Sequence, residues 1–186
     1  HRGHPEAEGT MGQSGAGMYL VETEEDVARL AVKDPANLAY VTQTTLSMDD
    51  TRDVIEALKK RFPTARGPDT NDICYATQNR QNAVKALLAD IDVLLVVGAR
   101  NSSNSNRLRE VGERAGKAAY LLGDAADLDP AWFGPDTRIG ITAGASTPQR
   151  LVDAVIEGLK GMGLDAIDTQ VGVAEEAIFR LPPELA

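Results

Sequence analysis

The feature that most constrains the fold is an apolar strand that runs directly into a polar turn and then a helix. Val93 to Val97 is an apolar run of strand length. Further along, Leu108, Val111 and Ala115 recur at helical spacing. The turn between them is therefore predicted to lie between the carboxyl end of a strand and the amino end of a helix.

This turn, residues 101–106, is predicted to bind an anion. Unpaired backbone N–H groups and the helix dipole at such a position favour a phosphate group. The turn consists of Ser and Asn residues, whose side chains add hydrogen-bond donors without adding charge. Another interpretation stays open at this stage, namely that Ser103 or Ser105 only caps the helix.

The remainder of the chain alternates between strand and helix patterns, which predicts an α/β fold with parallel sheets covered by helices. Residues 3–17 are rich in Gly and polar residues and are expected to form a loop. Helix starts are expected at a capping box of Thr23 and Asp26, at Ser47, and at Thr147 with Pro148 in the first helical position. The expected strands are residues 18–21, 37–41, 93–97, 118–122 and 138–142, and the expected helices include residues 23–32 and 74–89.

Two modules of similar layout are predicted. Residues 63–71 contain Pro, Gly, Asp and Thr and form the best candidate boundary. We therefore expect one α/β module over residues 1–70, a second over 71–171, and a tail over 172–186 that lacks helical periodicity.

An apolar strand enters a small polar turn and then a capped helix three times, at residues 41–47, 96–105 and 141–147. Ligands of open parallel sheets bind at the carboxyl ends of the strands, so a polar ligand is expected at these turns. The alternative is that such turns are a general property of alternating α/β chains.

Composition excludes several classes of partner. The 186 residues carry a formal net charge of -9 and no stripe of basic residues, which argues against nucleic acid and anionic membrane as partners. There is no apolar run of transmembrane length and no signal peptide pattern. The single cysteine excludes an internal disulfide and favours a reducing cytoplasm. Because the chain begins at His1, within a polar turn and without Met, we expect a fragment.

Several side chains are candidates for chemistry. Cys74 near a predicted helix start suits a thiolate ligand or nucleophile, although a lone cysteine is more often buried and inert. His4 and Glu6 flank Pro5 and could form an acid with its proton partner, or could simply be solvated. Thr44 could donate to a ligand or satisfy the turn backbone. Ser146 precedes the expected cap and is left for ligand contact.

Five motifs occur in order along nearly the whole chain. They are Gly3-His4-Pro5-Glu6 with Glu8-Gly9-Thr10-Met11-Gly12-Gln13, Thr42-Gln43-Thr44-Thr45-Leu46-Ser47, Asn71-Asp72-Ile73-Cys74-Tyr75-Ala76-Thr77, residues 101–108, and Thr142-Ala143-Gly144-Ala145-Ser146. With these motifs the chain closely resembles the LytB/IspH family of hydroxymethylbutenyl diphosphate reductases.

The resemblance implies a function and a set of site residues. The family reduces 4-hydroxy-3-methylbut-2-enyl diphosphate to isopentenyl and dimethylallyl diphosphate, the last step of the methylerythritol phosphate route. Three similar α/β domains surround a [4Fe-4S] cluster, and electrons come from a ferredoxin- or flavodoxin-type donor. The implied role of Cys74 is cluster ligand, and that of Glu6 is proton relay with His4 and Thr44 beside it. His4 and Thr44 are also implied to contact the substrate, and the diphosphate is bound by Ser102, Ser103, Asn104 and Ser146.

One departure from the family pattern matters. A family cluster uses three cysteines, whereas this chain has one. The resemblance therefore implies that the first of the three domains is absent and that the fragment alone is inactive. The competing hypothesis is a non-catalytic phosphate- or sugar-phosphate-binding module, which would use the Ser-rich turn but would need neither Cys74 nor Glu6.

Overall fold

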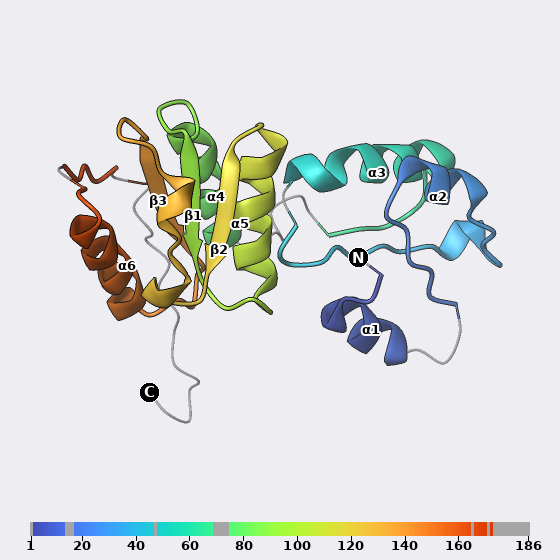
Figure 1. Ribbon diagram of the computed structural model, residues 1–186. Coiled ribbons are helices and arrows are strands. Elements are labelled where there is room, and N and C mark those ends of the chain that lie inside the picture. The colour runs from blue at the N-terminus through green and yellow to red at the C-terminus, as the bar shows by residue number, and fades with distance from the viewer. Residues whose placement is uncertain are drawn as a thin grey trace, which may run out of the picture.

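The strand predicted at residues 93–97 forms the centre of a three-stranded parallel sheet (Figure 1). A computed structural model describes residues 2–13, 17–46, 48–68, 75–164, 166–170 and 172. The strands are β1 (Val93–Val97), β2 (Ala118–Leu122) and β3 (Ile139–Ala143), in the spatial order β2-β1-β3. Val97 lies opposite Leu122 on one side and Ala143 on the other, so all three strands end at one edge.

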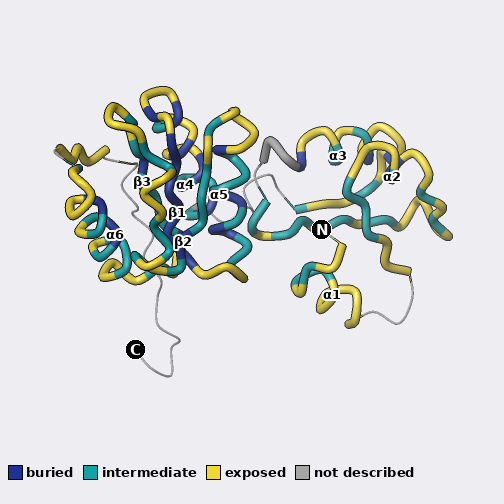
Figure 2. The backbone as a smooth tube through the Cα atoms, viewed as in Figure 1, coloured by how far each residue is buried: buried dark blue, intermediate teal, exposed yellow. Residues whose placement is uncertain are grey.

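Helices cover both faces of this sheet, as the alternating sequence pattern predicts. Helices α4 (Tyr75–Leu87) and α5 (Ser103–Arg114) pack on one face, and α6 (Gln149–Gly161) packs on the other (Figure 1). Alternate residues of β1 enter the two cores, with Leu94 facing α4 and α5 and Leu95 facing α6. Every residue of β1 is buried (Figure 2), which explains its uninterrupted apolar sequence.

The first half of the chain packs around a separate small core. Its helices are α1 (Pro5–Gly12), α2 (Glu24–Arg29) and α3 (Met48–Arg61). Val27 of α2 contacts Leu58 of α3 and Phe62 just after it, and all three are buried. Three short 3₁₀ turns complete the described structure, at Pro35–Asn37, Ala125–Asp127 and Pro130–Trp132.

The predicted α/β class is confirmed. The segments 18–21 and 37–41, which were expected to be strands, are extended but do not form strands of a sheet. A single parallel bridge joins Ala39 and Arg66. In it the Tyr40 N–H donates to the Arg66 carbonyl across 2.7 Å, and the Arg66 N–H donates to the Leu38 carbonyl across 2.9 Å. The pairing cannot extend past Pro68, because proline has no N–H to donate.

The expected loop over residues 3–17 was wrong in part, because α1 occupies Pro5–Gly12. His4 caps this helix with its side chain, and Pro5 occupies its first turn. Both Glu6 and Glu8 lie in the first turn, where carboxylates interact favourably with the helix dipole. These start signals outweigh the two glycines within the helix.

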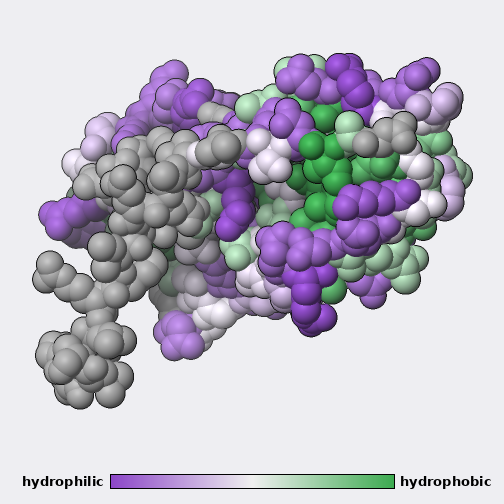
Figure 3. Space-filling view, turned by 90° about the vertical axis from the view of Figure 1, so that its left-hand side faces the viewer, coloured by the Kyte–Doolittle hydropathy of each residue, from purple (hydrophilic) through white to green (hydrophobic). Residues whose placement is uncertain are grey.

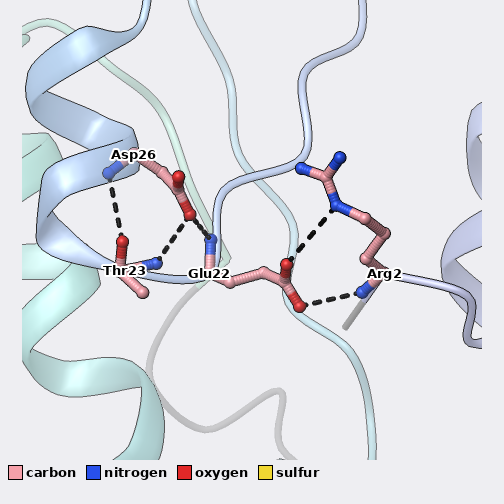
Figure 4. A network of polar contacts seen from close by, with 4 residues as sticks. All are labelled: Arg2, Glu22, Thr23 and Asp26. Carbon is pink, nitrogen blue, oxygen red and sulfur yellow. Dashed lines mark hydrogen bonds and ion pairs between the residues drawn. The ribbon is translucent and has the colours of Figure 1, made fainter.

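The capping box predicted at Thr23 and Asp26 is confirmed and belongs to a larger polar network (Figure 4). The Asp26 carboxylate accepts the backbone N–H groups of Glu22 and Thr23, at 3.0 and 3.1 Å. These N–H groups, that of Glu22 above all, hold the pKa of Asp26 below its ordinary value. The Glu22 side chain in turn accepts the backbone N–H of Arg2 at 2.8 Å, which ties the start of the chain to α2.

Three predicted features lie wholly or partly outside the described residues, namely the cap Ser47, residues 69–71 of the boundary segment 63–71, and the tail beyond residue 172. Viewed from the end of the molecule that carries α6, the surface is mostly hydrophilic, and hydrophobic side chains gather in one area (Figure 3). Among the described residues, no helix is both long enough and apolar enough to cross a membrane.

Acid should weaken the folded state partly through Asp127, whose carboxylate accepts the Gly123 N–H at 2.7 Å and pairs with Arg100 at 3.1 Å. These contacts, the Gly123 N–H first, lower the pKa of Asp127 from its ordinary value of 3.8. A lowered pKa contributes stability above the ordinary pKa, and this contribution is lost as pH falls through the lower folded value. We expect Asp127→Asn to be less stable than the unaltered protein at pH 6, and the difference to narrow at pH 3.

Urea unfolding followed by the fluorescence of Trp132, the single tryptophan of the chain, would measure this difference. Trp132 stacks on Tyr120 with ring centroids 3.9 Å apart, so its emission reports on the same packed region. A stability difference that stays constant from pH 6 to pH 3 would contradict the assignment to Asp127.

Candidate active site

The carboxyl edge of the sheet brings the turns after β1 and β3 together at the start of α5. The Val97 carbonyl accepts two hydrogen bonds from the second turn, one from the Gly144 N–H at 3.0 Å and one from the Thr147 hydroxyl at 2.9 Å. The Ala145 N–H donates to Asn104 Oδ1 across 3.1 Å. Two of the three turns predicted to receive a ligand are thus fixed against each other.

The cap of α5 is Ser102, so the alternative interpretation, in which Ser103 or Ser105 caps this helix, is wrong. Ser102 Oγ accepts the backbone N–H of Ser105 at 3.3 Å. Thr147 does not cap α6 either, because its hydroxyl is bonded to the Val97 carbonyl and Pro148 takes the cap position. Ser103 is therefore not needed for capping and is half-buried at the first position of α5.

Asn104 has an unused donor in this turn. Its side chain is 9% exposed. While Oδ1 is bonded to Ala145, the Nδ2 group is buried and has no hydrogen-bond partner among the described residues. A buried amide without a partner is costly, so this nitrogen is a natural contact for a ligand oxygen at the helix start.

His4 joins the first half of the chain to this turn. Its Nδ1 accepts the Glu6 backbone N–H at 3.1 Å, so the neutral ring carries its proton on Nε2. That Nε2 is in hydrogen-bond contact with the Ser103 hydroxyl, and it is therefore the donor. Because Ser103 Oγ accepts from His4, its own proton remains for another acceptor.

Glu6 and Thr44, a second pair of predicted site residues, also lie together. Glu6 Oε1 accepts the backbone N–H of Thr44 at 3.1 Å. Helix α1 thus presents a half-buried carboxylate to the turn that follows residues 37–41. The carboxylate and the imidazole of His4 come from one helix start, two residues apart.

A cavity of about 580 Å³ adjoins these groups. Its lining is largely apolar and comes from α1, α3 and the two extended segments, and Glu6 contributes to the wall. Arg107 and Arg114 of α5 reach the same cavity. Exposed hydrophobic side chains at its border include Met11, Met18, Tyr19 and Val41.

The structure places most, but not all, of the predicted site residues. Ser146 is exposed in the turn after β3, next to the residue that bonds Asn104. Cys74 lies outside the described residues, one position before α4 begins. No three His, Cys, Asp or Glu side chains in the described parts of the chain come together as a metal site. Sequence reasoning missed α1 and the burial of Ser105, although Pro5 followed by Glu6 and Glu8 is a helix-start signal.

Comparison with known proteins gives consistent results. The family model described as LytB protein matches residues 1–160. The chain is 59% identical to the 4-hydroxy-3-methylbut-2-enyl diphosphate reductase of Pseudomonas putida (strain W619), and the match covers 100% of this chain and 60% of the relative. The corresponding reductase of Bordetella pertussis is 59% identical, with 100% of this chain and 57% of the relative covered.

A solved structure agrees in fold as well as sequence. The E-1-hydroxy-2-methyl-but-2-enyl-4-diphosphate reductase from Plasmodium falciparum superimposes with a TM-score of 0.75 and 35% identity. That superposition covers 84% of this chain and 49% of the Plasmodium chain. This chain thus spans about three-fifths of the length of the curated relatives. Since the family model covers residues 1–160, the chain belongs to the LytB family.

Proposed function

We propose that the whole protein reduces 4-hydroxy-3-methylbut-2-enyl diphosphate to isopentenyl and dimethylallyl diphosphate, and that this chain supplies its diphosphate site and its proton donor. The reaction breaks the allylic C–O bond. Two electrons and two protons enter, and the hydroxyl group leaves as water. The observation that carries the proposal is the buried Nδ2 of Asn104, a donor without a partner among the described residues, at the start of α5.

The donors around Asn104 suit a diphosphate. Ser103 accepts from His4 and keeps a proton to donate, and Ser102 at the helix cap lies beside it. Ser146 is exposed on the neighbouring turn. Neutral donors at a helix amino end can bind a multiply charged anion without a cluster of basic residues, because the helix dipole contributes partial positive charge.

Glu6 is the proposed source of the proton that leaves with the hydroxyl oxygen. Its carboxyl group borders the cavity and is held in place by the Thr44 N–H. His4 and Thr44 act as its neighbours in the relay. A phosphate-binding module without catalytic activity would have no use for a carboxyl group placed this way, so the Glu6 contact favours the reductase over that alternative.

The residues of this chain do not, by themselves, fit a [4Fe-4S] cluster. Iron-sulfur clusters of this type are held by several cysteine thiolates, and the chain contains one cysteine. The described residues also bring no three potential ligands together. We propose Cys74 as one ligand of a cluster that needs thiolates from outside these 186 residues. A ferredoxin- or flavodoxin-type electron donor and a cytoplasmic location complete the proposal.

Alanine substitutions in the two turns test the diphosphate site. We expect Ser102→Ala, Asn104→Ala and Ser146→Ala each to weaken binding of inorganic diphosphate, by up to about 2 kcal/mol, because each removes a hydrogen bond to a charged group. Isothermal titration of the 186-residue chain measures the affinity.

Asn82→Ala is a matched control, because Asn82 is an exposed asparagine of α4 whose side chain accepts a hydrogen bond from Gln78 of the same helix. Its diphosphate affinity should equal that of the unaltered chain. If all three site variants also keep that affinity, the site assignment is wrong.

A further inference from the structure

We propose that Ser105 is a positioning residue that fixes the direction of the Ser102 hydroxyl, so that its proton points toward the bound diphosphate. The inference rests on the proposed function and adds a residue that does not itself touch the ligand. Ser105 is 1% exposed and is the third residue of α5, three positions after the cap Ser102.

Ser105 makes two contacts with the same oxygen atom. Its backbone N–H donates to Ser102 Oγ at 3.3 Å, which is the ordinary capping bond. Its side-chain hydroxyl lies 3.1 Å from the same Ser102 Oγ and donates to it. A serine at the third helical position does not need this second contact for capping, because the backbone N–H alone satisfies the cap.

The second contact determines what the Ser102 hydroxyl can do. A hydroxyl oxygen has two lone pairs and one proton. When both lone pairs accept from Ser105, the Ser102 proton has to point away from Ser105 and out of the helix start. Without the Ser105 hydroxyl, the capping N–H still occupies one lone pair, so the Ser102 proton can take about two staggered positions, and only one of them donates to the anion.

The Ser105 side chain itself is held in one place by two glycines. Gly98 follows β1 and Gly144 follows β3, and both are fixed by the sheet edge, where the Gly98 N–H donates to the Leu122 carbonyl at 2.8 Å. A Cβ atom added at Gly98 would lie 2.2 Å from Ser105 Oγ, and one added at Gly144 would lie 2.3 Å from it. The Ser105 hydroxyl therefore fills the space between the ends of β1 and β3. Through its bond to Ser102 it connects this edge of the sheet to the helix cap.

A double-mutant cycle tests the proposal with inorganic diphosphate as the probe. We expect Ser102→Ala to weaken binding at least about tenfold, because a hydrogen bond to a charged oxygen is lost. Ser105→Ala should weaken binding about twofold, since the donor remains but only about half of its population is oriented. The variant with both substitutions should bind as weakly as Ser102→Ala alone, because Ser105 acts only through Ser102.

Thr147→Val is the control for a purely structural effect. It removes another hydroxyl from the same space, and Thr147 Oγ1 lies 3.1 Å from the position of a Cβ at Gly144. Its hydroxyl bonds the Val97 carbonyl rather than Ser102. We expect it to lower the melting temperature at least as much as Ser105→Ala does. Any effect on diphosphate affinity should add fully to that of Ser102→Ala, because the Thr147 hydroxyl does not act through Ser102.

The outcomes separate this inference from the proposed function. If Ser102→Ala weakens binding but the effect of Ser105→Ala adds fully to it, Ser105 does not act through Ser102 and the inference is overturned while the diphosphate site stands. A Thr147→Val effect on affinity that also disappears in the Ser102→Ala background would overturn it as well, because the cycle would then report general disruption of the turn. If the unaltered chain does not bind diphosphate, both the site and the inference fail.

Discussion

Glu6→Gln is expected to lower the turnover of the complete enzyme at least about hundredfold while leaving its affinity for the diphosphate substrate nearly unchanged. Glutamine has the size of glutamate and keeps an oxygen that can accept the Thr44 N–H, which Glu6 Oε1 now accepts at 3.1 Å. It has no acidic proton to give to the leaving hydroxyl. Steady-state kinetics of the full-length protein would therefore show a loss in kcat with little change in KM.

Glu8→Gln provides the matched control for this experiment. Glu8 lies in the same first turn of α1 but is exposed and does not line the cavity. It contributes the same charge to the start of α1, so any effect through the helix dipole should be shared. Turnover of Glu8→Gln should stay within about twofold of the unaltered enzyme. Turnover of Glu6→Gln within that range would remove Glu6 from the mechanism.

Gly98→Ala should destabilise the protein by about 3 kcal/mol, near the upper end of what overpacking costs. The added Cβ would lie 2.2 Å from Ser105 Oγ and 2.8 Å from Ser105 Cβ. Rotation of the hydroxyl cannot relieve the second contact, so either α5 or the end of β1 has to move. Chemical denaturation followed by Trp132 fluorescence would measure the loss.

Gly161→Ala is the control, because a Cβ at Gly161 in α6 meets nothing within 4 Å. Alanine is the better helix former, so this variant should be as stable as the unaltered protein or up to about 1 kcal/mol more stable. Adding Ser105→Gly to Gly98→Ala removes the obstructing side chain and should recover part of the lost stability. If the denaturant concentration at the unfolding midpoint is the same for Gly98→Ala as for the unaltered protein, the close packing around Ser105 is contradicted.

The second half of the chain was predictable from sequence because its local signals agree with its tertiary structure. The strand at Val93–Val97 was predicted with its observed bounds, since a central parallel strand is buried on both faces and reads as an unbroken apolar run. The strand at Ala118–Leu122 was predicted equally well. The sheet class followed from the alternation of such strands with helices.

The errors lie where a local pattern had two physical outcomes. Glycine-rich residues 3–17 suggested a loop, yet Pro5 and two early carboxylates were enough to start α1. Ser102, Ser103 and Ser105 all suit a helix cap by composition, and only the backbone geometry selects Ser102. The bridge at Ala39 shows that an apolar segment of strand length forms no ladder when its partner strand ends at a proline.

The candidate site residues were predicted from sequence mainly through motifs, whereas their contacts could not be predicted. Nothing in the spacing of His4 and Ser103 along the chain predicts that their side chains meet, because that contact depends on the tertiary arrangement of the two halves. The same holds for Glu6 and Thr44. Cys74 remains a prediction from the motif alone.

The two halves of the candidate site come from parts of the chain that contain separate hydrophobic cores. His4, Glu6 and Thr44 lie in the first half, whose core includes Val27 and Leu58, whereas the Ser/Asn turn follows β1, the centre of the second half. Because cooperative unfolding depends on shared packing, we expect each core to open separately. In the proposed function the Ser/Asn turn binds the diphosphate and Glu6 faces the substrate hydroxyl, so a bound substrate would link the two parts reversibly. Its binding free energy would add to the stability of the joined state alone, and substrate would make the two parts unfold together.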